Sequence, residues 1–158
     1  MRLSGFVGCL ALHALTAMVM PSAWWVPNIT LVAMSVAITA RPRAWFPMGL
    51  AAGWFMTAWA VRHTTTLLIG YLILAGAIAW LAQRWELTEP RTQRRVVAAG
   101  AGAMTCWLLW LDHLWSLPVL GWSILHVAAT TLIVPLLQYW WRYRPRQRHG
   151  AGVGFGVG

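Results

Sequence analysis

The chain has 158 residues, of which 59% are hydrophobic and only 9% are charged. A water-soluble domain usually carries about 25% charged residues, so this composition excludes an ordinary soluble protein and indicates an integral membrane protein. The formal net charge is +9, but the basic residues lie between apolar runs, which favours membrane orientation over nucleic-acid binding. Cys9 and Cys106 both lie inside apolar runs, so they form neither a disulfide framework nor a CxxC metal pair.

Six apolar stretches are the predicted membrane spans, because a bilayer core of ~30 Å requires about 20 helical residues, with a range of roughly 17–25. They cover residues 3–20, 25–40, 44–61, 64–83, 96–111 and 118–141. Helices are expected because an isolated strand would leave its backbone groups unpaired in lipid. We therefore expect an all-α integral membrane protein with about six transmembrane helices in a single domain, residues 1–141. Thr64 and the two threonines after it are expected to cap the fourth helix.

The arginines predict the orientation of these spans. All twelve basic residues are arginines, and with six spans eleven of them fall on one side of the membrane and only Arg62 on the other. Basic residues accumulate on the cytoplasmic side, so both termini are expected to be cytoplasmic. The use of arginine alone is typical of a GC-rich bacterial genome. We expect a multi-pass protein of the bacterial inner (cytoplasmic) membrane.

Two basic segments on the cytoplasmic side are candidate surfaces for docking a partner or for binding anionic lipid. The first is the predicted loop at residues 84–95. The alternative interpretation of this segment is a solvated loop with local Glu–Arg pairing and no partner. The second is the tail at residues 142–158, which is basic and then glycine-rich. The candidate docking and lipid residues are Arg91, Arg94, Arg95, Arg142, Arg144, Arg146 and Arg148.

Small residues predict where the helices pack closely. Gly49 and Gly53 lie four residues apart, on one side of a helix, where they let another backbone approach. Gly70 and Gly76 are expected to do the same in the fourth span. Since this pattern is common in membrane helices, we interpret these four glycines as a helix-packing or partner face.

Few ionisable residues lie within the predicted spans, and these are the candidates for chemistry. His13 and His126 are candidate ligands of haem or bacteriochlorophyll, the alternative being a hydrogen bond to a neighbouring helix. Asp112 and His113 resemble a catalytic pair, but adjacent residues on a helix point about 100° apart. No Walker loop, HExxH, GxSxG or CxxC pattern is present. We therefore expect a non-enzymatic protein without a metal site, and we predict no cofactor beyond the haem or pigment option.

An ordered series of motifs between residues 24 and 142 resembles MreD, the small membrane subunit of the bacterial rod-shape system. The series consists of Pro27-Asn28 before an aliphatic span, Arg41-Pro42 in a basic turn, Gly49 with Gly53, the run from Tyr71 to Leu74, and His126 before Pro135. The chain departs from that family at Met56-Thr57, where an acid is usual, and at His126, where an asparagine is usual. The resemblance implies a six-helix fold like the substrate-binding components of vitamin transporters.

The MreD resemblance implies a non-enzymatic scaffold that binds the single-span partner MreC and helps couple MreB filaments to peptidoglycan synthesis. Two alternatives stay open. In the first, the chain is an accessory subunit of a pigment- or haem-bearing membrane complex, with His13 and His126 as ligands of the pigment or haem. In the second, it is a small-ligand-binding membrane protein, similar to a vitamin-transporter component or to the tryptophan-rich sensory proteins.

Overall fold

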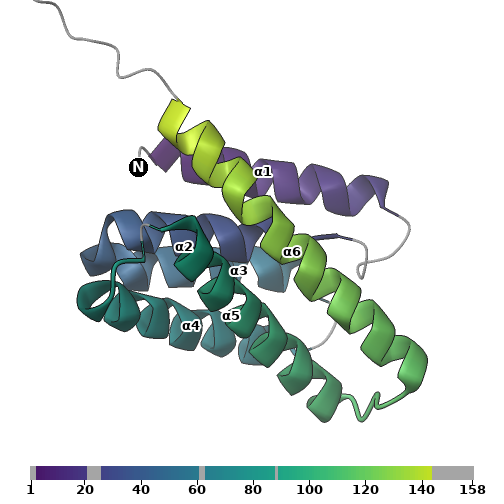
Figure 1. The fold of residues 1–158 in the computed structure, drawn as a ribbon. Coiled ribbons are helices and arrows are strands. Elements are labelled where there is room, and N and C mark those ends of the chain that lie inside the picture. Colours follow the sequence, from purple (N-terminus) through teal and green to yellow (C-terminus); the bar gives the residue numbers. More distant parts are fainter. Residues whose placement is uncertain (1–2, 21–25, 61–62, 88, 144–158) are drawn as a thin grey trace, which may run out of the picture.

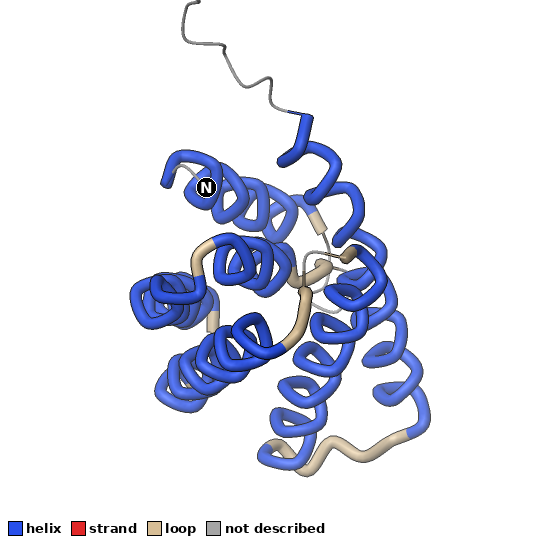
Figure 2. Tube along the Cα trace, turned by 60° about the vertical axis from the view of Figure 1, so that its left-hand side comes forward, coloured by secondary structure: helices blue, strands red, loops and turns tan. Residues whose placement is uncertain are grey.

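The computed structural model describes residues 3–20, 26–60, 63–87 and 89–143 (Figure 1). Every regular element in these residues is helical, which confirms the all-α prediction (Figure 2). The helical elements within the described residues are α1 (Leu3–Val19), α2 (Ile29–Ala40), the short 3-10 helix η2 (Pro42–Ala44), α3 (Trp45–Trp59), α4 (Thr64–Arg84), α5 (Pro90–Leu111) and α6 (Leu117–Tyr143). The predicted tail lies beyond α6, at residues 144–158, and is outside the described residues.

The predicted boundaries agree closely with the structure for α1, α3, α4 and α6 and differ for the other two helices. Helix α2 begins at Ile29, four residues later than predicted. Helix α5 begins at Pro90, six residues earlier than predicted, so the expected loop at residues 84–95 was wrong. Proline is favoured in the first turn of a helix, and arginine and glutamine are good helix formers, so the helix extends through this basic segment. Arg91, Arg94 and Arg95 therefore lie on the first turns of α5.

The expected threonine cap of α4 was also wrong. The residue at the cap position is His63, which has a left-handed backbone with φ of 58°, and its side chain makes no capping hydrogen bond. Thr64 is instead the first residue of the helix.

Helix α2 is the centre of the fold. Its residues are buried without a break from Ile29 to Ile38, and it contacts all five other helices. A helix that is apolar on every side is stable only when other elements enclose it completely. The remaining helices surround α2, and α6 crosses the bundle diagonally on its way to the C-terminal end (Figure 1).

The structure places Gly49 and Gly53 of the predicted packing face against α4 of the same chain. A Cβ atom at Gly49 would lie 2.6 Å from the Cβ atom of Ala75, and one at Gly53 would lie 3.1 Å from the Cα atom of Leu68. The absence of side chains at these two positions therefore allows α3 and α4 to form the closest helix pair in the protein. These two glycines are consequently not open to another protein.

The other two glycines of that prediction pack inside the chain as well. A Cβ atom at Gly70 would lie 2.6 Å from the sulfur of Met104 on α5. One at Gly76 would only touch the ring of Trp45, at 3.6 Å. Gly70 thus joins α4 to α5, whereas Gly76 provides an ordinary van der Waals contact with α3.

Two helices in the described residues are long and apolar enough to cross a membrane, namely Thr64–Arg84 and the Leu117–Tyr139 part of α6. Gly5–Val19 and Ile29–Ala40 are apolar but shorter. The described residues thus form six α-helices, but length and apolarity support a membrane span for only two of them, so the prediction of six spans is not confirmed.

We predict that Gly49→Ala and Gly53→Ala each destabilise the fold. The added methyl group has no space against α4, and overpacking of this kind costs roughly 1–3 kcal/mol. Matched controls are Gly102→Ala and Gly121→Ala, where an added Cβ meets nothing within 4 Å. Thermal unfolding of the four purified variants in detergent checks this. Equal melting temperatures for the two pairs would contradict the close α3–α4 contact.

Candidate functional site

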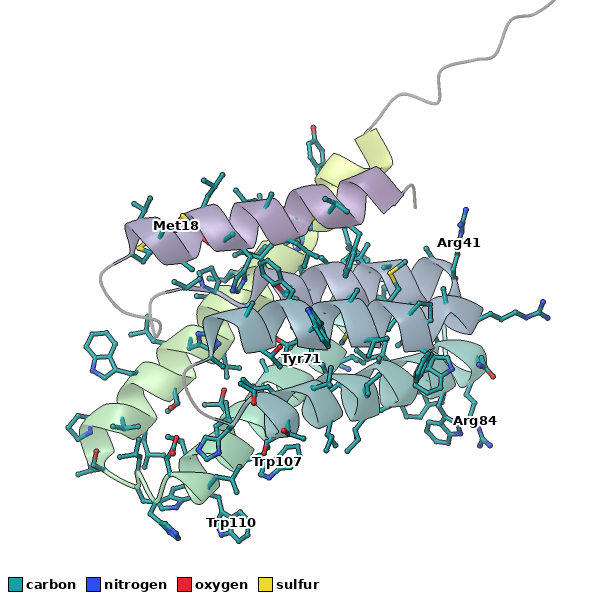
Figure 3. All side chains as sticks on the ribbon, turned by 180° about the vertical axis from the view of Figure 1, so that it is seen from behind. Met18, Arg41, Tyr71, Arg84, Trp107 and Trp110 are labelled. Atoms are coloured by element: carbon teal, nitrogen blue, oxygen red, sulfur yellow. The ribbon has the colours of Figure 1, made fainter. Side chains whose placement is uncertain are left out.

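The described arginines gather at one end of the molecule. Arg41 and Arg43 lie where α2 ends and η2 turns, and Arg84 ends α4. The three arginines of α5, at positions 91, 94 and 95, lie in the first two turns of that helix. Figure 3 shows Arg41 and Arg84 at the same end, with Met18 and Trp110 well away from it. Charges far apart in the sequence thus form a single basic surface, which we call the arginine end.

The side chains of the arginine end differ in their surroundings. The guanidinium of Arg84 stacks on the ring of Trp80, 4.5 Å from the ring centroid, which is a cation–π contact. Arg91 and Arg95 are exposed, one helical turn apart on α5. Arg94 is half-buried, and its Nε atom is buried without a hydrogen-bond partner. The remaining predicted docking residues, Arg142, Arg144, Arg146 and Arg148, have side chains outside the described residues.

The opposite end carries an ion pair between α4 and α5. His63 Nε2 lies 2.8 Å from a carboxylate oxygen of Asp112, and both side chains are about 30% exposed. Pairs this exposed contribute about 0–1 kcal/mol. Asp112 thus contacts His63 rather than its sequence neighbour His113, which has its own left-handed backbone at φ of 53°. The sequence did not predict this pair, because the two residues are 49 positions apart.

A buried polar cluster at the start of α2 joins three helices. The side chain of Asn28 caps α2 by accepting a hydrogen bond from the backbone N–H of Leu31 at 2.9 Å. Its amide donates to the hydroxyl of Tyr71 on α4 at 2.7 Å, and that hydroxyl donates back to Asn28 Oδ1 at 2.9 Å. The backbone N–H of Asn28 donates to the Thr130 hydroxyl on α6, also at 2.9 Å. Asn28 therefore fixes α4 and α6 against the beginning of α2.

A second buried polar cluster lies nearer the arginine end. The amide of Gln93 on α5 donates to the hydroxyls of Ser35 and Thr39 on α2, at 3.4 and 3.5 Å. The amide of Gln138 on α6 donates in turn to the carbonyl oxygen of Gln93. The side-chain oxygen of Gln138 is buried without a partner. This cluster ties α5 and α6 to α2 through uncharged groups.

The structure brings the two predicted cofactor ligands near one another. His13 on α1 is only 5% exposed, and its ring lies edge-on to Phe55 with centroids 5.8 Å apart. His126 on α6 is half-buried and lies within electrostatic range of His13. The Nδ1 atom of His13 is buried without a hydrogen-bond partner, which fits a ligand role for that imidazole. Among the described residues, no three or more His, Cys, Asp or Glu side chains are grouped so that they could hold a metal ion.

The two cysteines are separate from these clusters. Cys9 is buried on α1, Cys106 is exposed on α5, and neither is in a disulfide.

Comparison with known proteins provides no relative. No protein-family model, no curated protein and no solved structure matches the chain.

Proposed function

We propose that the chain is a multi-pass protein of the bacterial cytoplasmic membrane, with the arginine end in the cytoplasm. The observation that carries this proposal is the concentration, at one end of an apolar helical bundle, of the six arginines whose side chains the structure describes. Basic residues at one end of a membrane domain follow the positive-inside pattern. The exposed aromatic rings of Trp80 and Trp85 lie at the same end, where amphipathic rings settle at headgroup level.

The outward surface supports the same proposal. Large apolar side chains are exposed along α1 and α6, among them Leu15 at 60% and Leu132 at 68%. An apolar surface of this extent is unusual on a soluble monomer and suits hydrocarbon.

Helix α2 fits a membrane domain although it is too short to cross the bilayer core. Its 12 residues extend about 18 Å, against a hydrocarbon core of ~30 Å. Irregular backbone at membrane depth is tolerated where protein encloses it. The other helices surround α2, and Asn28 satisfies backbone groups at its start.

We predict that single cysteines introduced at Arg43, Arg84 and Ser116 distinguish six spans from two. In a Cys9→Ala, Cys106→Ala background, six spans place Arg43→Cys and Arg84→Cys in the cytoplasm and Ser116→Cys outside. If only α4 and α6 crossed the membrane, positions 84 and 116 would share a side and position 43 would lie opposite them. Labelling of intact and disrupted spheroplasts with a membrane-impermeant maleimide is the measurement.

Within this membrane location, we propose a non-enzymatic scaffold subunit of the MreD type that binds a single-span MreC-like partner. The motif order from residue 24 to residue 142 supports the family, and α6 supports the scaffold role. Only 17% of the apolar part of α6 is buried, against 33% for α4. Its outward residues Leu125, Leu132 and Leu136 are all more than half exposed, so α6 offers an open apolar face to a partner helix.

We predict that an MreC-like protein co-purifies with the tagged chain and that depletion of the chain rounds a rod-shaped host. Leu125→Ala, Leu132→Ala and Leu136→Ala together should abolish co-purification, because they remove the packing surface of α6. The matched control is Ile69→Ala with Ile73→Ala, exposed residues on the outward face of α4. A normal rod shape after depletion would refute the scaffold role.

A second candidate is an accessory subunit of a haem- or pigment-bearing complex, favoured by the approach of His13 to His126. Their imidazole nitrogens would hold the group, which supplies electron transfer or light absorption when bound. On this hypothesis the complex isolated from its host absorbs in the haem or bacteriochlorophyll region. His13→Ala should remove those bands, whereas His113→Ala, at an exposed histidine, should keep them. A spectrum with protein absorption alone excludes this role.

A further inference from the structure

The arginine end contains an open hollow of about 700 Å³. It lies where α2 passes through η2 into α3, beside the last turn of α4. The residues that line it are Arg41, Pro42, Arg43, Ala44 and Gln83. Two cationic side chains and one amide therefore surround a single concave surface.

Arg41 and Arg43 form no ion pair with another residue in the described part of the chain. Arg41 and Arg43 are both exposed, and the ion pair formed among the described residues joins His63 to Asp112, at the opposite end. Of the two acids on the α4–α5 connection, Glu89 accepts a hydrogen bond from Thr92. Guanidinium groups pair strongly with phosphate, through parallel N–H···O hydrogen bonds. The hollow thus has the chemistry of a phosphate site.

The surface beside the hollow is apolar along one helix. Phe46, Leu50 and Trp54 follow one another at intervals of four residues on α3, so they lie on one face of it. They are 53%, 39% and 69% exposed. The stripe begins two residues after Ala44, which lines the hollow, and extends toward the opposite end of the bundle. A hollow with two arginines, followed along the chain by an exposed apolar stripe, suits a phosphate headgroup attached to acyl chains.

We propose that this hollow binds the headgroup of an anionic phospholipid. The phosphate accepts hydrogen bonds from Arg41 and Arg43, Gln83 contacts the polar headgroup, and an acyl chain lies along Phe46, Leu50 and Trp54. The proposal rests on the membrane location proposed above. Basic pockets between helices on the cytoplasmic side are suited to such headgroups. The site differs from the arginines of α5, which lie outside the hollow.

The test is a lipid titration of the full chain in detergent, followed by native mass spectrometry. The probes are phosphatidylglycerol and phosphatidylcholine, with inorganic phosphate as a competitor. Each basic charge near an anionic surface contributes about fivefold to affinity. Arg41→Gln with Arg43→Gln should therefore weaken phosphatidylglycerol binding roughly 25-fold and leave phosphatidylcholine binding unchanged. Both arginines are exposed, so the double variant should melt at the wild-type temperature.

The matched control is Arg91→Gln with Arg95→Gln, which removes two exposed charges from the same end but outside the hollow. This variant should lose much less phosphatidylglycerol binding than the Arg41→Gln, Arg43→Gln variant, because it retains the site. Equal losses in the two double variants, or equal binding of the two lipids, would overturn the proposal. Displacement of the lipid by equimolar inorganic phosphate would instead identify a soluble phosphate compound as the occupant. Failure of the chain to sediment with membranes would refute the membrane location itself.

Discussion

The fold depends on satisfying the backbone groups at the two ends of α2, a short helix that is buried without a break from Ile29 to Ile38. An unpaired donor or acceptor beside this buried stretch costs about 1–3 kcal/mol. Asn28 meets this constraint at the start, where it caps the helix and bonds to Tyr71 and Thr130. At the other end, the backbone N–H of Arg41 donates to the carbonyls of Ala37 and Ile38. The residue that closes α2 on this side is thus also the first residue of the hollow.

The two polar clusters give the bundle a fixed interior and leave its outer surface apolar. Asn28 orients α4 and α6 at one level, and Gln93 orients α5 and α6 at another. Uncharged amides and hydroxyls do this without the desolvation cost of a buried ion pair. Because the polar groups bond to each other inside, the outward faces of α1, α3 and α6 remain available to lipid or to a partner helix. An outer surface this rich in exposed large apolar side chains is unusual for a soluble bundle, and it supports the membrane location.

The fold could be predicted from the sequence where the determinants are local. Apolar runs separated by arginines predicted six helices, and the spacing of Gly49 and Gly53 predicted close packing. Local patterns could not reveal that Asn28 meets Tyr71 and Thr130, which lie 43 and 102 residues away. The early start of α5 was missed because hydropathy detects membrane spans, whereas a helix can continue through arginines outside the hydrocarbon. His13 and His126 were predicted separately as ligands, and only the folded structure brings them within electrostatic range of one another.

The arginine end divides into two regions with different physical roles. Arg91 and Arg95 on α5 are exposed to solvent, where salt screens their charges within about 8 Å at physiological ionic strength. They act as a diffuse field, which suffices to orient the chain and to attract anionic surfaces. Arg41 and Arg43 instead border a concave surface, where guanidinium geometry and a limited volume select what binds. If the chain lies in the membrane as proposed, its orientation should tolerate the loss of one or two arginines anywhere at this end, whereas the proposed headgroup binding should depend on the two that line the hollow.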